Sequence, residues 1–158
     1  MQDIQTITSY ISEIPDPEIP VITIKELGIL RDVKWHEDLL VVTITPTYTG
    51  CPAMEMIESQ IKENLAIHGY ANVRVDLTYS PAWTTDWMSE VAKEKLRNYG
   101  ISPPVHSSCF KSFSALNIAC PRCKSTHTRL ISQFGSTACK ALYQCEDCKE
   151  PFDHFKCH

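Results

Sequence analysis

Two pairs of closely spaced cysteines near the carboxyl end of the chain have the pattern of a metal site. Cys120 and Cys123 form one Cys-x-x-Cys unit, Cys145 and Cys148 form a second, and 21 residues separate the two units. Two thiolates three positions apart can bind one ion, and two such units supply the four sulfurs of a tetrahedral site. The spacing therefore predicts a small zinc-ribbon-like β module.

The spacing leaves the identity of the ion open. Closed four-thiolate sites usually hold a structural zinc ion, but thiolates also hold iron-sulfur clusters. Strands expected at Thr128–Phe134 and Ala141–Gln144 would carry the two units. Because so short a module buries little apolar surface, the metal is expected to supply much of its folding free energy.

Three more cysteines of this region have no assigned role. Cys139 and Cys157 are candidates for extra metal ligands, although burial as a small apolar side chain is the simpler expectation for Cys139. Cys157 lies one residue from the end of the chain and is expected to be exposed. No spacing identifies a partner for Cys109.

The eighth cysteine, Cys51, directly precedes Pro52, and proline favours the first position of a helix. Cys51 is therefore expected to cap a helix, where the positive end of the helix dipole lowers the pKa of a thiol. A thiolate at this position could bind metal or attack an electrophile. Position alone supports equally a partly buried small residue that ends a strand.

Two carboxylates, Asp16 and Glu18, lie in a turn that contains three prolines and could be solvated charges. No spacing completes a hydrolase triad around Cys51, and the chain has no glycine-rich phosphate loop. Both Cys-x-x-Cys units fall in β-rich surroundings, which disfavours a thioredoxin-like oxidoreductase. The residues therefore give little support to the ordinary enzyme templates, and we do not expect an enzyme.

The elements that must position these side chains follow from hydrophobic periodicity. They are helices at residues 3–13, 53–67 and 84–100 and strands at residues 29–35, 39–45 and 73–77. The first two strands are close enough to form a β-hairpin. This order predicts an α+β fold, an α-β-β-α-β-α sandwich with its helices on one face of a three-stranded sheet.

Charge and composition divide the chain into two modules. Residues 1–107 hold 8 Lys and Arg against 15 Asp and Glu, whereas residues 108–158 hold 7 against 4 and seven of the eight cysteines. A linker composition around residues 102–108 places the boundary between an α+β domain at 1–104 and a ribbon module at 105–158.

Several classes of protein are disfavoured by composition. No run of about 18 apolar residues exists, and the first residues lack the basic start and apolar stretch of a secretory signal. We expect a cytoplasmic protein without membrane contact, and in that reducing compartment clustered thiols bind metal more often than they form disulfides. A net charge of −4 without a long basic stripe argues against nucleic acid as a partner.

Five segments also carry a resemblance to known families. Residues 16–20, 27–29 and 49–52 (Asp-Pro-Glu-Ile-Pro, Leu-Gly-Ile and Thr-Gly-Cys-Pro) resemble the SufT-type family of iron-sulfur assembly factors. Residues 80–87 and the carboxyl-terminal ribbon are similar to the PaaD (PaaJ) family, which is encoded with the bacterial phenylacetyl-CoA epoxidase. This second resemblance spans nearly the whole chain.

The resemblance implies an accessory role in aerobic phenylacetate catabolism. The client would be the epoxidase, whose diiron oxygenase and iron-sulfur reductase subunits need assembly or repair of their centres, and iron-sulfur assembly proteins would be further partners. Cys51 would hold iron or a cluster transiently, with Asp16 and Glu18 nearby. A docking subunit of the epoxidase with a purely structural zinc site is the alternative, and a homodimer formed through Cys51 stays open.

Overall fold

The computed structural model describes residues 3–105 and 117–156. Cys109 and Cys157 lie outside the described residues. The chain divides into two compact units, Met1–Trp83 and Thr84–His158. No helix within the described ranges is both long and apolar enough to cross a membrane.

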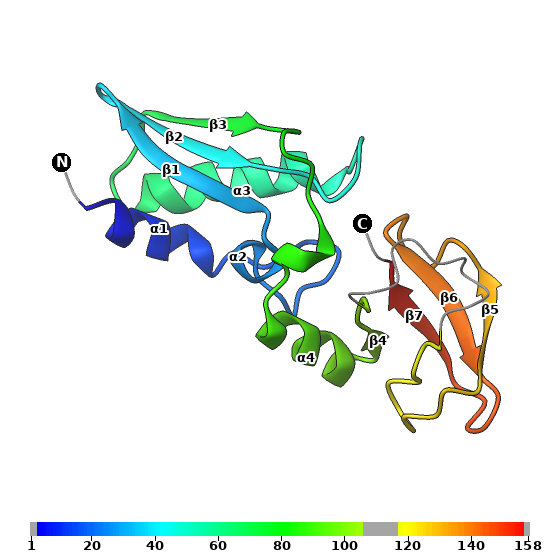
Figure 1. The fold of residues 1–158 in the computed structure, drawn as a ribbon. Coiled ribbons are helices and arrows are strands. Elements are labelled where there is room, and N and C mark those ends of the chain that lie inside the picture. Colours follow the sequence, from blue (N-terminus) through cyan, green and yellow to red (C-terminus); the bar gives the residue numbers. More distant parts are fainter. Residues whose placement is uncertain (1–2, 106–116, 157–158) are drawn as a thin grey trace. The chain divides into compact units, whose positions relative to one another are not determined.

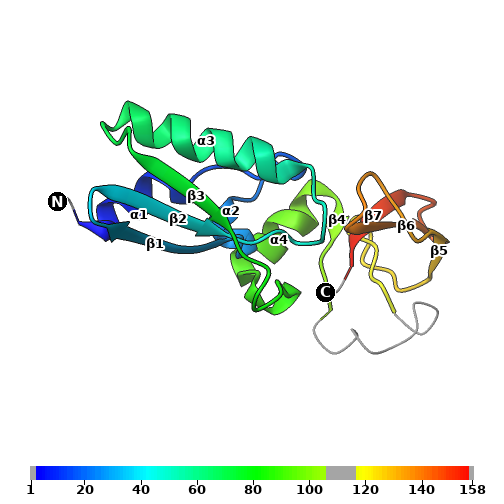
Figure 2. The same cartoon turned by 90° about the horizontal axis from the view of Figure 1, so that it is seen from above.

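The first unit is a three-stranded sheet with two helices on one of its faces (Figure 1). Its elements are α1 (Ile4–Ser12), α2 (Ile24–Leu27), β1 (Leu30–His36), β2 (Leu39–Ile44), α3 (Ala53–Ile67) and β3 (Val73–Leu77). β1 and β2 form an antiparallel hairpin, and β3 pairs with β2 in parallel, which gives the order β1-β2-β3. A parallel pair needs a crossover connection, and α3 supplies it (Figure 2).

The core of this unit forms where α1 and α3 cover the sheet. Both helices bury apolar residues at three- and four-residue spacing, and β2 is buried almost throughout. The fully buried side chains include Ile7, Ile11, Leu40, Val42, Ile57, Ile61 and Leu65. The predicted α+β class, the hairpin and the crossover helix are confirmed.

Two helices differ from the prediction. α2 is a single turn that the sequence analysis missed, and Thr23 and Glu26 cap it reciprocally. The helix expected at residues 84–100 is broken, because a 3-10 turn at Thr85–Trp87 precedes α4 (Glu90–Tyr99). The Ser89 side chain accepts a hydrogen bond from the Ala92 N–H and so starts α4 later than expected.

The second unit contains α4 and a four-stranded sheet in the order β4-β7-β6-β5. The strands are β4 (Ile101–Ser102), β5 (Thr128–Ser132), β6 (Lys140–Cys145) and β7 (Pro151–Phe155). The sequence analysis missed β7, and it assigned Ser102 of β4 to a linker. β4 pairs with β7, and residues 101–104 are buried, so this stretch belongs to the ribbon unit together with α4. The domain boundary at residues 104 and 105 stays a prediction.

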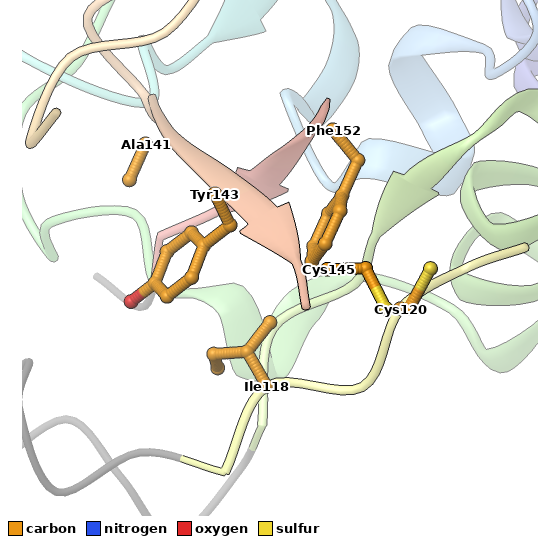
Figure 3. Packing of buried hydrophobic residues seen from close by; sticks show 6 residues of the cluster. All are labelled: Ile118, Cys120, Ala141, Tyr143, Cys145 and Phe152. Carbon is orange, nitrogen blue, oxygen red and sulfur yellow. The ribbon is translucent and has the colours of Figure 1, made fainter. Parts of the chain in front are cut away.

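A small apolar cluster forms the core of the ribbon, and Figure 3 shows it from close by. Its buried members are Ile118, Cys120, Ala141, Tyr143, Cys145 and Phe152. Cys120 and Cys145 lie at one end of the cluster beside Phe152. Two of the four predicted metal ligands are thus continuous with the core, so ligation and packing depend on each other.

The buried side chain of His154 on β7 predicts an acid-sensitive ribbon. His154 is 2% exposed, and burial lowers its pKa to about 4. The unfolded chain, with a histidine pKa of about 6.5, binds more protons, so the stability from neutral His154 is complete above pH 6.5 and is lost as pH falls toward 4. Between pH 7 and pH 5, the free energy of unfolding of the wild-type ribbon should fall by about 2 kcal/mol more than that of His154→Leu. Hydrogen exchange of β6 and β7 measures this, and parallel losses in both proteins would refute it.

Candidate metal centre and candidate thiol site

The four predicted ligand sulfurs meet at one point of the ribbon unit. The sulfurs of Cys120, Cys123, Cys145 and Cys148 all lie within 4.8 Å of one another. The Sγ atoms of Cys120 and Cys148 are 3.7 Å apart, and those of Cys123 and Cys145 are 3.5 Å apart. None of the described cysteines forms a disulfide.

The two Cys-x-x-Cys units have the same backbone geometry. The N–H of Cys120 donates to the carbonyl of Ser125, and the N–H of Cys145 donates to the carbonyl of Glu150, so both turns close over the same number of residues. The residue after each unit, Lys124 or Lys149, has a positive φ of 67° or 66°. Sequence spacing predicted the paired units, but not that a lysine would adopt this left-handed conformation, which glycine adopts more easily.

The separations of the sulfurs fit a single tetrahedral ion. Metal-sulfur bonds of about 2.3 Å place the sulfurs of a tetrahedral site about 3.8 Å apart. In a two-iron cluster the four thiolates are divided between two iron atoms, and in a four-iron cluster each thiolate binds its own iron atom, so thiolates on different iron atoms lie further apart than in a single-ion site. The donor set is therefore suited to one ion that prefers thiolates.

Backbone groups favour a thiolate at Cys145, whereas burial and the neighbouring thiols outweigh the Glu150 N–H and raise the pKa of Cys148 to about 12. The N–H groups of Cys148 and Asp147 point at the Cys145 sulfur and lower the pKa of that thiol to about 7. Cys145 is fully buried by its neighbours, yet the amides compensate for the lost water. This arrangement assists ligation because a metal-bound cysteine must give up its proton.

Two polar contacts outside the sulfur cluster join the turns of the two Cys-x-x-Cys pairs. Asp147 lies between the two cysteines of the second Cys-x-x-Cys pair. It accepts a hydrogen bond from the Ser125 hydroxyl and lies 3.3 Å from Nδ1 of His127. Arg122, between the two cysteines of the first Cys-x-x-Cys pair, forms an ion pair with Glu150 at 2.6 Å. These contacts hold the two turns side by side, as groups around metal ligands commonly do.

Removal of the Asp147 contact should therefore speed the release of the metal. Asp147→Asn keeps the size of the side chain but weakens its bonds to Ser125 and His127, and loss of such outer contacts typically costs about 10-fold to 100-fold in metal affinity. We expect release to a colorimetric chelator to be about tenfold faster. Asp153→Asn, in β7, is the matched control. Equal release rates in wild type and Asp147→Asn would show that the contact is dispensable.

Cys139 does not belong to the four-sulfur group. It lies just before β6, whereas Cys145 ends that strand, and its sulfur is 3.0 Å from the Thr137 hydroxyl. The expected burial of Cys139 is confirmed, with 2% of the residue exposed. Its placement argues against a role as an extra ligand of this site.

Cys51 occupies the loop between β2 and α3 in the first unit. The Cys51 N–H donates to the Tyr48 carbonyl, and Gly50 between them has a φ of 77°. α3 begins at Ala53 with Pro52 as its N-cap, so Cys51 lies one residue before the cap and does not cap the helix itself. The thiol is half-buried, at the carboxyl end of a strand that is paired in parallel, where α/β folds commonly bind ligands.

The two carboxylates of the proline turn lie near Cys51, as the family resemblance implies, but they differ from each other. Asp16 is 5% exposed, and its Oδ1 accepts hydrogen bonds from the N–H groups of Glu18 and Ile19. Asp16 therefore shapes the turn. Glu18 is only half-buried, and its Oε1 lies 3.5 Å from the Tyr48 hydroxyl.

The expected low pKa of Cys51 is wrong for this structure. Partial burial raises the pKa of the thiol, and the negative charges of Glu18 and Asp16 raise it further. The Ala53 N–H and the Tyr48 hydroxyl oppose this rise, but they do not outweigh it. The sequence analysis considered only the helix start and did not consider the carboxylates that the fold brings to the same place.

Tyr48 is a site residue that the sequence analysis missed. Its hydroxyl contacts Glu18 and can donate to the sulfur of Cys51. A signal was present, because a residue three positions before Cys51 in a glycine turn must lie near the thiol. The thiol, the carboxylate and the phenol together form a compact group that can bind a cation in exchange for a proton.

Comparison with known proteins finds an iron-sulfur assembly family for the first unit and a zinc ribbon family for the second. A family model described as "Iron-sulfur cluster assembly protein" matches residues 4–77, and one described as "PaaD zinc beta ribbon domain" matches residues 104–156. The chain is 53% identical to an Escherichia coli protein that is named as a subunit of 1,2-phenylacetyl-CoA epoxidase, over 98% of this chain and 93% of that protein. It is 34% identical to the "Fe-S protein maturation auxiliary factor" of Porphyromonas gingivalis, over 61% of this chain and 92% of that protein.

Solved structures resemble a large part of the chain. A DUF59 domain of unknown function from Bacillus anthracis has a TM-score of 0.54 and 29% identity, and the match covers 59% of this chain and 90% of that one. A conserved hypothetical protein from Thermotoga maritima has a TM-score of 0.50 and 29% identity, with coverage of 60% and 94%. These matches agree with the α+β architecture described above.

Proposed function

The chain belongs to the PaaD family of phenylacetyl-CoA epoxidase proteins, whose first domain resembles the Fe-S protein maturation auxiliary factors, and from this premise we propose that it helps to assemble or repair the iron centres of such an epoxidase. In this role it is an accessory protein of the oxygenase and reductase subunits and not a catalyst. Other iron-sulfur assembly proteins would supply the iron or cluster.

The observation that carries this proposal is the grouping of Cys51 with Glu18 and Tyr48 in a half-buried loop. Neighbouring carboxylates disfavour a bare thiolate but favour a thiolate bound to a cation, because the cation offsets their charge. Iron, or the iron of a cluster, would therefore bind to Cys51 as the thiol proton leaves. A site with one thiolate and open positions suits cargo that must be passed on.

We assign zinc to the ribbon. The separations of the sulfurs suit one ion, and four thiolates with no open position are typical of a structural zinc site. The name of the matching ribbon family agrees with this assignment. An iron-sulfur cluster in the ribbon, the alternative from the sequence, fits these short separations less well.

The experiment that tests the proposed function compares cells with and without this chain. The oxygenase and reductase subunits are purified from both without oxygen, and iron and acid-labile sulfide are measured per subunit. We expect the subunits from cells that lack the chain to be deficient in iron, and we expect iron to return when the chain is supplied. A docking subunit with only a structural role predicts full iron content and loss of the complex instead.

A further inference from the structure

A cavity in the second compact unit borders the four-cysteine site and is also lined by residues that neither site uses. Its volume is about 310 Å³. It lies among α4, the segment that follows β4 and the first Cys-x-x-Cys unit. The residues that line it include Glu90, Lys93, Pro103, Pro104, Cys120 and Pro121.

The polar residues that line this cavity include Lys93, Arg97, Lys124 and Glu90. Arg97 is paired with Glu94 at 2.7 Å, and the Lys124 Nζ donates to the Pro121 carbonyl, so Lys93 is the cation on which an anion would bind. The amide of Asn117 adds further hydrogen-bonding capacity. Pro103, Pro104, Val105 and Ala119 also line the cavity and supply apolar surface.

Lys93 is the buried cation among the residues that line the cavity. Only 3% of its side chain is exposed, and its Nζ binds Oε1 of Glu90 at 2.8 Å. The side chain of Glu90 is 79% exposed, so the pair joins a buried ammonium to a carboxylate that water already solvates. A buried charge needs a close counter-charge, whereas an exposed carboxylate loses little when it turns away.

We propose that this cavity binds a small organic acid, with the carboxylate of the ligand on Lys93 in place of Glu90 and its apolar body against the two prolines. The volume suits a ligand of this size and excludes large cofactors. The buried ammonium of Lys93 favours an anion at this position. The apolar surface selects an acid with a hydrocarbon body over a bare inorganic anion.

The experiment is an NMR titration of the full-length, metal-loaded protein with three probes: hexanoate, benzoate and inorganic phosphate. The two organic acids should shift the amide signals of Lys93, Asn117 and Ala119, and phosphate should bind at least tenfold more weakly. Equal binding of phosphate would refute the apolar half of the site. Absence of shifts at these amides with either organic acid would overturn the proposal.

Two substitutions with opposite expected effects separate binding from folding. Lys93→Met should weaken binding about tenfold, as expected for the loss of one hydrogen bond to a charged group. Glu90→Gln, at an exposed position, should tighten binding about threefold because it removes the competing carboxylate. Lys62→Met removes a comparable helix ion pair of the first unit and is the matched control.

The cations could instead serve only the neighbouring metal centre. A divalent ion held by four thiolates leaves net negative charge, and Cys120 also borders the cavity. That interpretation predicts that Lys93→Met releases metal faster while the two organic acids bind neither protein. This pair of results would replace the proposal, and unchanged affinity in Glu90→Gln would also contradict it.

Discussion

Cells in which this chain carries Cys51→Ser should produce client subunits that lack most of their iron, although the variant itself folds normally. Serine is close in size to cysteine, and Cys51 lies in a half-buried loop outside the main core, so little packing is lost. The hydroxyl of serine does not ionise near neutral pH and is a poor ligand for iron. We expect the iron content of the clients to fall at least tenfold, toward the level found without the chain.

A second thiol provides the control for this prediction. Cys139→Ser changes a cysteine that lies outside the four-sulfur group and in the other unit of the chain. It should leave the iron content of the clients unchanged wherever the protein accumulates normally. Full iron content with Cys51→Ser would remove Cys51 from the mechanism.

Loss of the ribbon metal should unfold the ribbon and leave the first unit intact. Structural zinc in small modules has apparent binding free energies of about 10–16 kcal/mol at neutral pH, which exceeds what a core of six buried residues can supply. Cys120→Ser removes a buried ligand and should abolish stoichiometric metal binding. The amides of β6 and β7 should then exchange with solvent rapidly, whereas those of β2 and α3 remain protected.

The same exchange experiment shows whether α4 depends on the ribbon. β4 follows α4 directly and pairs with β7, so α4 should lose protection together with the ribbon. Protection of α4 and β4 in metal-free protein would instead support the predicted boundary at residues 104 and 105. Retention of stoichiometric metal by Cys120→Ser would contradict the four-thiolate site.

The regular elements of the first unit were predictable because their buried apolar residues recur at the spacing of a helix or a strand. Helix α3 matches the predicted range at residues 53–67, and the alternating residues of β3 identified that strand. α2 was missed because one helical turn holds too few residues for periodicity to detect. β4 has only two residues and was missed for the same reason. β7 is as long as β3 but begins at a proline, which disfavours a strand assignment, and its partner β4 is far away in the chain.

The two candidate sites differed in how far the local sequence predicted them. The four-cysteine group follows from spacing alone, since each unit brings two sulfurs together locally and only one tertiary contact is then needed. The surroundings of Cys51 come from separate segments, and the effects of Glu18 and Asp16 on its pKa depend on their approach in space. Local sequence therefore predicted a thiolate where the fold holds a protonated thiol.

The central claim is that the four-cysteine site holds zinc and that Cys51 binds iron. Metal analysis combined with a visible spectrum tests this claim most directly. Wild type and Cys51→Ser are purified without oxygen, exposed to ferrous iron and sulfide, and then desalted. We predict one zinc ion per chain in both proteins, and iron with visible absorbance in wild type alone. Iron bound in place of zinc in both proteins, or equal iron in both, would contradict the account.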